Sequence, residues 1–215
     1  MGRLQMTDDV RVVRLLTARP WQGKAQPVHR RMRRLALTML VQTGCLTVAR
    51  THAGVADGPQ AQMTTTMYGI EDDDGDWGTG AQAQLDMGWG ARLSNNAGIY
   101  AGARVAFPWF KTSQLDLYLQ GPSTKNVMFG FGVEGGAYIA GPYASLTMAG
   151  DQGYMTLTGR VNTPVEAWNA LYGGQIAFGL QWFLLYAGYM QDADGNSVVQ
   201  GGVGFVPEWD RRARD

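Results

Sequence analysis

Apolar and polar residues alternate without a break at residues 77–93, and this pattern is the first indication of the fold. The odd positions hold only Trp, Thr, Ala, Leu and Met, whereas the even positions hold Gly, Gln, Asp and Arg. A period of two places the two sets on opposite faces of a β-strand. The stretch is 17 residues long, far beyond the usual strand of about 5–6 residues. We therefore predict a membrane-spanning β-strand here.

Similar alternation recurs along the chain, with turn residues such as Asp194-Gly195-Asn196 between the stretches. The predicted strands are residues 63–70, 77–93, 97–109, 114–120, 127–134, 143–148, 154–161, 171–180, 183–190 and 197–206. An even number of strands is what closed antiparallel outer-membrane barrels require. The sequence thus predicts an all-β fold, a single antiparallel up-and-down transmembrane β-barrel of 8–10 strands. Ten strands are favoured over eight, although residues 63–70 and 143–148 alternate only weakly.

An alternative for residues 171–190 is a transmembrane helix, since the stretch is mostly apolar and has the length of about 20 residues that a spanning helix needs. It contains four glycines and many aromatic residues. Glycine disfavours helices, and aromatic residues are enriched in strands. We therefore favour two strands with a very short connection.

The charge of the chain is distributed unevenly, which indicates a targeting segment. Residues 1–53 hold ten basic and two acidic residues, whereas residues 54–215 hold eight basic and sixteen acidic residues. The basic stretch 29–34 is followed by the apolar stretch 35–48 and by Thr51-His52-Ala53, with small residues at the −3 and −1 positions. This order is typical of a secretory signal peptide. We predict export and cleavage after Ala53.

The domain organisation follows from these boundaries. Residues 1–53 form a basic leader with the signal peptide at about 28–53, residues 54–61 a short linker, residues 62–209 the barrel, and residues 210–215 a charged tail. The only cysteine, Cys45, lies in the leader, so a chain cut after Ala53 has no disulfide. The alternative is a lipoprotein cut before Cys45, but Gln42 stands where such sites usually carry an apolar residue.

The scarcity of charge outside the leader indicates which face of the strands meets lipid. Lys111 and Lys125 are the only lysines in residues 54–215, whereas a soluble surface carries about 25–35% charged residues. We therefore expect the polar face to line the lumen and the apolar face to contact lipid. Trp77 and Trp89 are twelve residues apart. On a tilted strand this spacing spans about 30 Å across the membrane, close to the height of about 25 Å of the apolar band. With Trp109 they form a predicted lipid-facing girdle.

With this pattern, residues 62–209 resemble the small Gram-negative outer-membrane barrels of the OmpA/OmpX-like class. These proteins typically end in a strand with a glycine and terminal aromatic residues, and Gln200, Gly202 and Phe205 fit that pattern. Pro207 stands where another aromatic residue is typical, so the resemblance is to the class and not to one family. It implies an outer-membrane location, contact with outer-membrane lipid and lipopolysaccharide, and insertion by the barrel assembly machinery.

The polar face carries three acids and three arginines. They are Asp86, Arg92, Arg104, Asp116, Glu134 and Arg160. Buried charges are costly unless they are paired, and barrels of about eight strands are just filled by side chains. We therefore predict a luminal network that fills the barrel, and a structural or surface-binding role. The alternatives are a narrow pore or transporter for a small solute or an apolar molecule, and a secreted, soluble, lipocalin-like binding barrel with inverted faces.

Other chemistry is scarce in the predicted mature chain. Both histidines, His29 and His52, lie in the leader, whereas the known outer-membrane phospholipases, lipid A deacylases, palmitoyl transferases and omptin-like proteases use a histidine. We therefore expect no enzyme, no catalytic residue and no cofactor. The acidic mature chain also disfavours nucleic-acid binding, which needs a basic surface.

One acidic cluster, at residues 71–76, is a candidate metal site. Asp72, Asp74 and Asp76 have a spacing similar to that of a calcium loop. Trp77 occupies the sixth position, where an EF-hand needs glycine, and Ala83 the twelfth, where it needs glutamate. We keep these aspartates as a weak calcium candidate; the simpler interpretation is a solvated extracellular loop that divalent cations bridge to lipopolysaccharide.

Overall fold

The computed structural model describes residues 49–52, 54–71, 75–107, 114–124, 126–136, 139–164 and 170–207. Ten strands make up almost all of this part of the chain. They are β1 (Gly58–Glu71), β2 (Trp77–Ser94), β3 (Ala97–Phe107), β4 (Gln114–Gln120), β5 (Val127–Gly136), β6 (Ile139–Ala149), β7 (Gly153–Pro164), β8 (Leu171–Leu180), β9 (Phe183–Gln191) and β10 (Ser197–Phe205).

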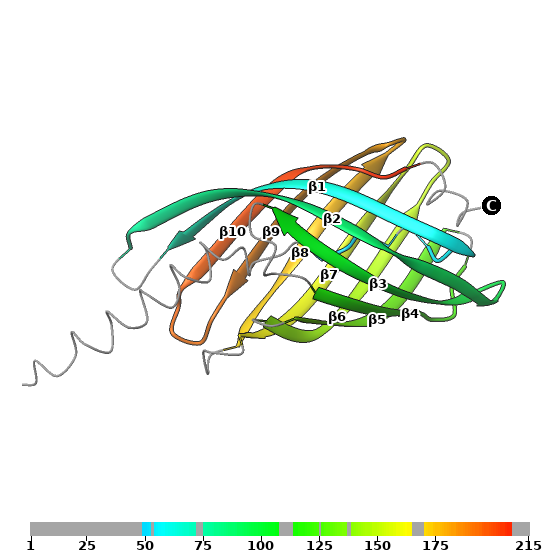
Figure 1. Cartoon of the computed structure of the whole chain (residues 1–215), viewed down its shortest axis with the longest axis horizontal. Coiled ribbons are helices and arrows are strands. Elements are labelled where there is room, and N and C mark those ends of the chain that lie inside the picture. Colours follow the sequence, from blue (N-terminus) through cyan, green and yellow to red (C-terminus); the bar gives the residue numbers. More distant parts are fainter. Residues whose placement is uncertain are drawn as a thin grey trace, which may run out of the picture. The chain divides into compact units, whose positions relative to one another are not determined.

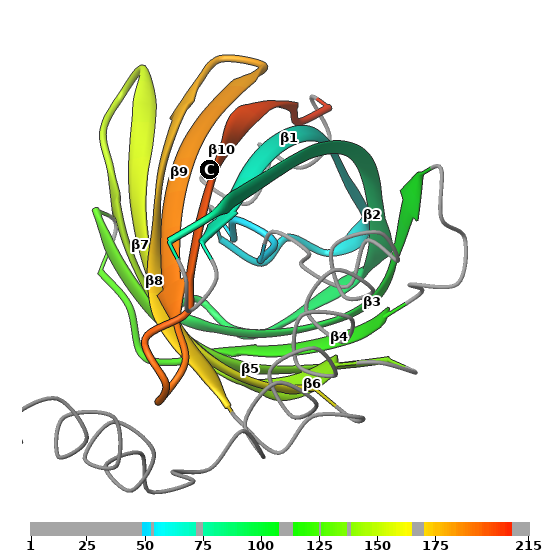
Figure 2. The ribbon, with the colours of Figure 1, turned by 90° about the vertical axis from the view of Figure 1, so that its left-hand side faces the viewer.

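The strands form one closed barrel. Each strand pairs antiparallel with its neighbours in sequence, and β1 closes the ring by pairing with β10 from Met63↔Phe205 to Glu71↔Ser197. Figure 2 shows the resulting ring, and Figure 1 shows the same strands from the side. The start of β1 and the end of β10 lie at the same end of the barrel, as an even number of strands requires. The predicted ten-stranded up-and-down barrel is confirmed.

The two faces of the strands differ as the alternation predicts. Along β2 and β3 the even-numbered side chains point into the barrel and the odd-numbered ones point outward. Large apolar side chains cover the outside; Met67, Leu115 and Phe131 are 73%, 72% and 66% exposed. Glutamines, threonines and charged residues lie inside. A polar interior and an apolar exterior are those of a transmembrane barrel of the outer-membrane type, which confirms the predicted fold and agrees with the predicted location.

β1 is longer than the sequence pattern predicts. It begins at Gly58, so that residues 58–61, which we expected in a linker, pair with β2 from Gly58↔Gly90 to Ala61↔Met87. Gln60, Gln62 and Thr64 explain the extension, because these buried polar residues continue the luminal face of the strand. The expected linker is therefore wrong for residues 58–61.

β6 passes through Gly141-Pro142, where the sequence suggests a break. Glu134 and Val133 of β5 pair with Gly141 and Pro142, whereas neither of these two residues pairs with β7. Proline has no N–H to donate to the ladder. Gly141 is also needed at this point, because a Cβ would collide with the carbonyl oxygen of Val161. The strand thus continues with an interruption on one edge only.

Residues 171–190 form β8 and β9, joined by a two-residue turn. Leu180 pairs with Phe183 across this turn, and Gln181 adopts a positive φ of 50°. The favoured interpretation of two strands is therefore confirmed over the alternative of a spanning helix. Within the described ranges, no helix is long and apolar enough to cross a membrane.

Candidate functional site

A cluster of charged side chains occupies the middle of the lumen, with Arg104 of β3 at its centre. The Nε atom of Arg104 lies 2.6 Å from Oδ1 of Asp86, and its Nη1 lies 2.7 Å from Oε2 of Glu134. Nη1 also donates a hydrogen bond to Oε1 of Gln114, at 3.1 Å. None of the Arg104 side chain is exposed. One guanidinium thus joins residues of β2, β4 and β5.

The network continues from Glu134 toward β7. Oε1 of Glu134 lies 3.2 Å from Nη2 of Arg160 and accepts a hydrogen bond from Nδ2 of Asn162 at 3.0 Å. The ion pairs therefore run from Asp86 through Arg104 and Glu134 to Arg160, over strands β2 to β7. Each of these buried charges has an opposite charge beside it, as burial in a low-dielectric lumen requires.

One of the six predicted charges lies outside the network. Asp116 joins the network at a longer distance, with its Oδ2 4.0 Å from Nη2 of Arg104. Arg92 lies exposed near the end of β2, where a bulge between Arg92 and Ser94 interrupts the pairing with β3. Its backbone N–H donates to Oδ1 of Asp57 at 2.6 Å. The structure thus brings Asp86, Arg104, Asp116, Glu134 and Arg160 together and leaves Arg92 outside, because parity alone does not tell how far along the strand a residue lies.

Tyrosines fill the space around this network, and glycines on neighbouring strands accommodate their rings. Tyr118 pairs with Gly132, which in turn pairs with Tyr143. A Cβ at Gly132 would collide with the ring of Tyr143. Tyr154 pairs with Gly179 in the same relationship, and a Cβ there would collide with the Tyr154 ring. Gly132 and Gly179 therefore leave the space that these aromatic side chains fill.

Apolar side chains occupy the lumen on the side of β8, β9 and β10. One cluster contains Tyr154, Ala177, Leu184, Tyr186 and Val206. A second cluster contains Tyr68, Ile70, Leu171, Met190 and Val198. Leu184 belongs to the start of β9 and Met190 to its end, so the two clusters lie toward opposite ends of the barrel. The ionic network and the apolar clusters thus occupy different parts of the lumen.

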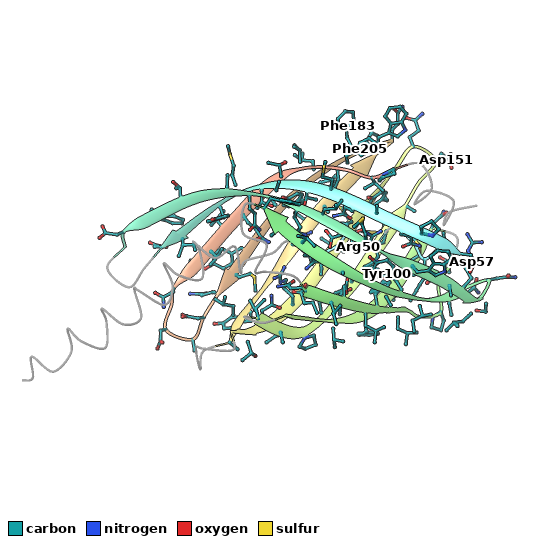
Figure 3. The ribbon with its side chains drawn as sticks, in the orientation of Figure 1. Arg50, Asp57, Tyr100, Asp151, Phe183 and Phe205 are labelled. Carbon is teal, nitrogen blue, oxygen red and sulfur yellow. The ribbon has the colours of Figure 1, made fainter. Side chains whose placement is uncertain are left out.

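The lumen also holds a segment that the sequence assigns to the leader and the start of the linker. Residues 49–52 and 54–57 run inside the ring of strands, where Figure 2 shows them as the cyan trace. Arg50, Thr51 and His52 are all at most 2% exposed. Figure 3 shows Arg50 beside Tyr100 in the middle of the barrel, and the guanidinium carbon lies 4.6 Å from the centre of that ring. Sequence reasoning missed these luminal residues, because nothing in a cleavage signal indicates contact with the barrel.

The other predicted site residues are the tryptophans of the girdle and the aspartates of the calcium candidate. Trp77 begins β2 and Trp89 lies twelve residues further along its outer face, and they are 53% and 64% exposed, whereas Trp109 lies outside the described residues. Asp72 and Asp74 of the calcium candidate also lie outside them, and Asp76 is exposed before β2. No group of three or more possible metal ligands occurs among the residues that the structure describes.

Among known proteins, the chain is similar to solved β-barrel structures. No protein-family model and no curated protein sequence matches the chain. The NanC porin matches with a TM-score of 0.43 and 10% identity, covering 69% of this chain and 98% of that one. The KdgM porin in complex with disordered oligogalacturonate gives 0.42 and 5%, covering 68% and 98%. The attachment invasion locus protein Ail of Yersinia pestis gives 0.28 and 12%, covering 71% and 100%. Likeness at this level indicates no ligand or activity.

Proposed function

We propose that this chain is a non-enzymatic outer-membrane barrel with a structural or surface-binding role, whose lumen is closed by its own side chains. The observation that carries the proposal is the ion-pair series from Asp86 through Arg104 and Glu134 to Arg160. Fixed, paired and fully buried side chains do not line a hydrated path, in which water would solvate them. The two apolar clusters support the same conclusion from the opposite wall.

Single-channel measurements in planar bilayers test the closed lumen. The protein extracted from the bacterial envelope is inserted, and the current is recorded at several voltages. We expect no steady conductance steps above those of the protein-free bilayer. A steady, ion-selective conductance of the wild-type protein would contradict the closed lumen. Migration on SDS gels before and after boiling, which differs for a folded membrane barrel, confirms that the inserted protein is folded.

A narrow pore is the second candidate, and one observation favours it. Part of the lumen is filled by residues 49–52, which the sequence places upstream of the predicted cleavage after Ala53. Removal of these residues would leave the tyrosine-lined side of the lumen without its filling. The same bilayer measurement, made on processed protein and on refolded full-length chain, separates the candidates. Conductance that occurs only after processing would identify a pore.

The surface-binding part of the proposal rests on the acidic residues 71–76 between β1 and β2. Carboxylates are ligands that Ca²⁺ prefers, and a bound Ca²⁺ can bridge them to the phosphates of lipopolysaccharide. We expect the protein to bind lipopolysaccharide vesicles in the presence of Ca²⁺ and to lose part of this binding when Asp72, Asp74 and Asp76 are changed to Asn. Equal binding by both proteins, with and without Ca²⁺, would contradict the role of this loop.

A further inference from the structure

The wall of the lumen binds the backbone of residues 49–57 at several points. Gln175 donates from Nε2 to the carbonyl oxygen of Ala49 at 3.2 Å, and Thr147 donates from Oγ1 to that of His52 at 2.9 Å. Two further glutamines accept backbone N–H groups: the Oε1 atoms of Gln62 and Gln120 accept from Thr51 at 3.2 Å and from Val55 at 2.7 Å. These four side chains belong to β8, β6, β1 and β4. The wall therefore recognises a peptide backbone.

The wall also has places for two side chains of the segment, a guanidinium and an imidazole. The ring of His52 stacks on that of Tyr118 with 3.7 Å between the ring centres and 2° between the planes. Its Nε2 lies 3.1 Å from the hydroxyl of Tyr143 and 3.6 Å from Oδ2 of Asp116. Arg50 lies over the face of Tyr100 (Figure 3). An aromatic face attracts a guanidinium or imidazolium most strongly where water is excluded.

The charges of the wall favour a positive occupant. In the central network the strands supply three carboxylates but only two guanidiniums, those of Arg104 and Arg160. Arg104 is closest to Asp86 and Glu134, and Arg160 lies beside Glu134. Asp116, only 3% exposed, accepts at Oδ1 from the hydroxyl of Tyr143, while its Oδ2 has no hydrogen-bond partner. The third carboxylate therefore has its strand cation, Arg104, only at 4.0 Å, and the imidazole of His52 lies closer to the same oxygen, at 3.6 Å.

We infer that this part of the lumen is a binding site for a peptide in which a guanidinium and an imidazole side chain are two residues apart. The site consists of Tyr100, Tyr118, Tyr143 and Asp116 with the glutamines that hold the backbone. While the leader is attached, Arg50 and His52 of the chain itself occupy it. A cut after Ala53 vacates it, and an Arg-x-His segment of another chain then binds in the same way.

Peptide binding to the refolded full-length chain tests the site directly. The probe is a fluorescently labelled peptide with blocked ends and the sequence of Ala49–His52, and binding is followed by anisotropy in detergent micelles. In the wild-type chain the site is already occupied, so we expect weak binding. In the Arg50→Ala/His52→Ala variant the chain's own segment keeps its backbone hydrogen bonds but loses its two aromatic contacts, so it competes less strongly for the site. We therefore expect the peptide to bind at least about tenfold more tightly. Equal affinity of the two proteins, or binding to neither, would overturn the inference.

Wall substitutions in the Arg50→Ala/His52→Ala background show where the peptide binds. We expect Asp116→Asn to weaken binding about tenfold through loss of the carboxylate. Tyr118→Leu, which removes the stacking ring and keeps every charge, is the second variant if Asp116→Asn does not fold. The control is Gln200→Ala, which removes a buried side chain of β10 whose Nε2 has no hydrogen-bond partner among the described residues. An equal loss in the control would overturn the assignment to this wall.

The intact mass of envelope-extracted protein shows whether residues 49–52 are still attached. Measured together with peptide binding, it tells whether the site is occupied by the chain's own segment or is open to a segment of another chain. A chain that begins at Gly54 should bind the peptide without any substitution, and a chain that retains Ala49–His52 should not. A processed chain that fails to bind would overturn the inference. Because the readout is peptide binding and not current, an open pore in bilayers would contradict the closed lumen and leave this inference standing.

Discussion

Arg104 on β3 and Glu134 on β5 are joined by an ion pair of 2.7 Å across β4, although their strands do not pair with each other. An Arg side chain is long enough to reach over one strand on the concave side of the sheet. This contact makes the lumen a tertiary core rather than a row of neighbouring pairs, and it makes Arg104 the residue on which the closed lumen depends most.

Truncation of Arg104 should destabilise the barrel strongly. Arg104→Ala leaves Asp86 without its guanidinium and removes one of the two cations beside Glu134. We expect a loss of about 3–5 kcal/mol in the free energy of unfolding, the usual cost of breaking a buried pair from one side. Urea unfolding in lipid vesicles measures it.

The matched control for this change is Arg92→Ala, because Arg92 lies exposed near the end of β2. We expect a change of less than about 1 kcal/mol for an exposed charge. A stable Arg104→Ala protein, together with a cation-selective current in planar bilayers, would contradict the filled lumen and favour the pore.

The luminal glycines should resist substitution where a tyrosine ring fills their space. Gly132→Ala forces a methyl group into the ring of Tyr143, and overpacking of this kind costs about 1–3 kcal/mol. Gly159→Ala on the outer face of β7 is the control, because no atom lies within 4 Å of the added Cβ. Urea unfolding should show Gly132→Ala destabilised and Gly159→Ala unchanged or slightly stabilised. The opposite order would contradict the assignment of the two faces.

Much of this barrel follows from alternation alone, since parity decides which side chains of β2 and β3 point inward. Register does not follow, because it depends on turn geometry and on bulges. The pairing of Tyr118 with Gly132 and the bulge that accompanies the exposure of Arg92 therefore could not be predicted. Contacts between distant segments, such as Gln175 with Ala49, are also invisible to a local pattern.

The cost of placing a charged side chain on the outward face should depend on its depth in the membrane. Leu85 lies near the middle of β2, between Met63 and Val105 on its neighbours, whereas Leu93 lies near the end of the same face. Leu85→Arg should cost about 2–4 kcal/mol at the membrane midplane, and Leu93→Arg about 0–1 kcal/mol at the interface. The two variants make the same change on one strand, about 20 Å apart along the axis. Equal folding yields in lipid vesicles would contradict the lipid-facing orientation.

The protein in the envelope should begin near Gly54 and lack Cys45, because a basic stretch, an apolar stretch and small residues precede Ala53 in the order of a signal peptide. A cut at this point keeps the anchors that hold the start of β1, namely the bond from Val55 to Gln120 and the bond from Arg92 to Asp57. It removes Arg50 and His52 with their luminal contacts. Intact mass of the envelope-extracted protein checks the start directly. A diacylated Cys45 at the N-terminus would contradict this prediction, because the chain would then begin at Cys45 and not near Gly54. Residues 49–52 would in that case remain attached and fill part of the lumen permanently.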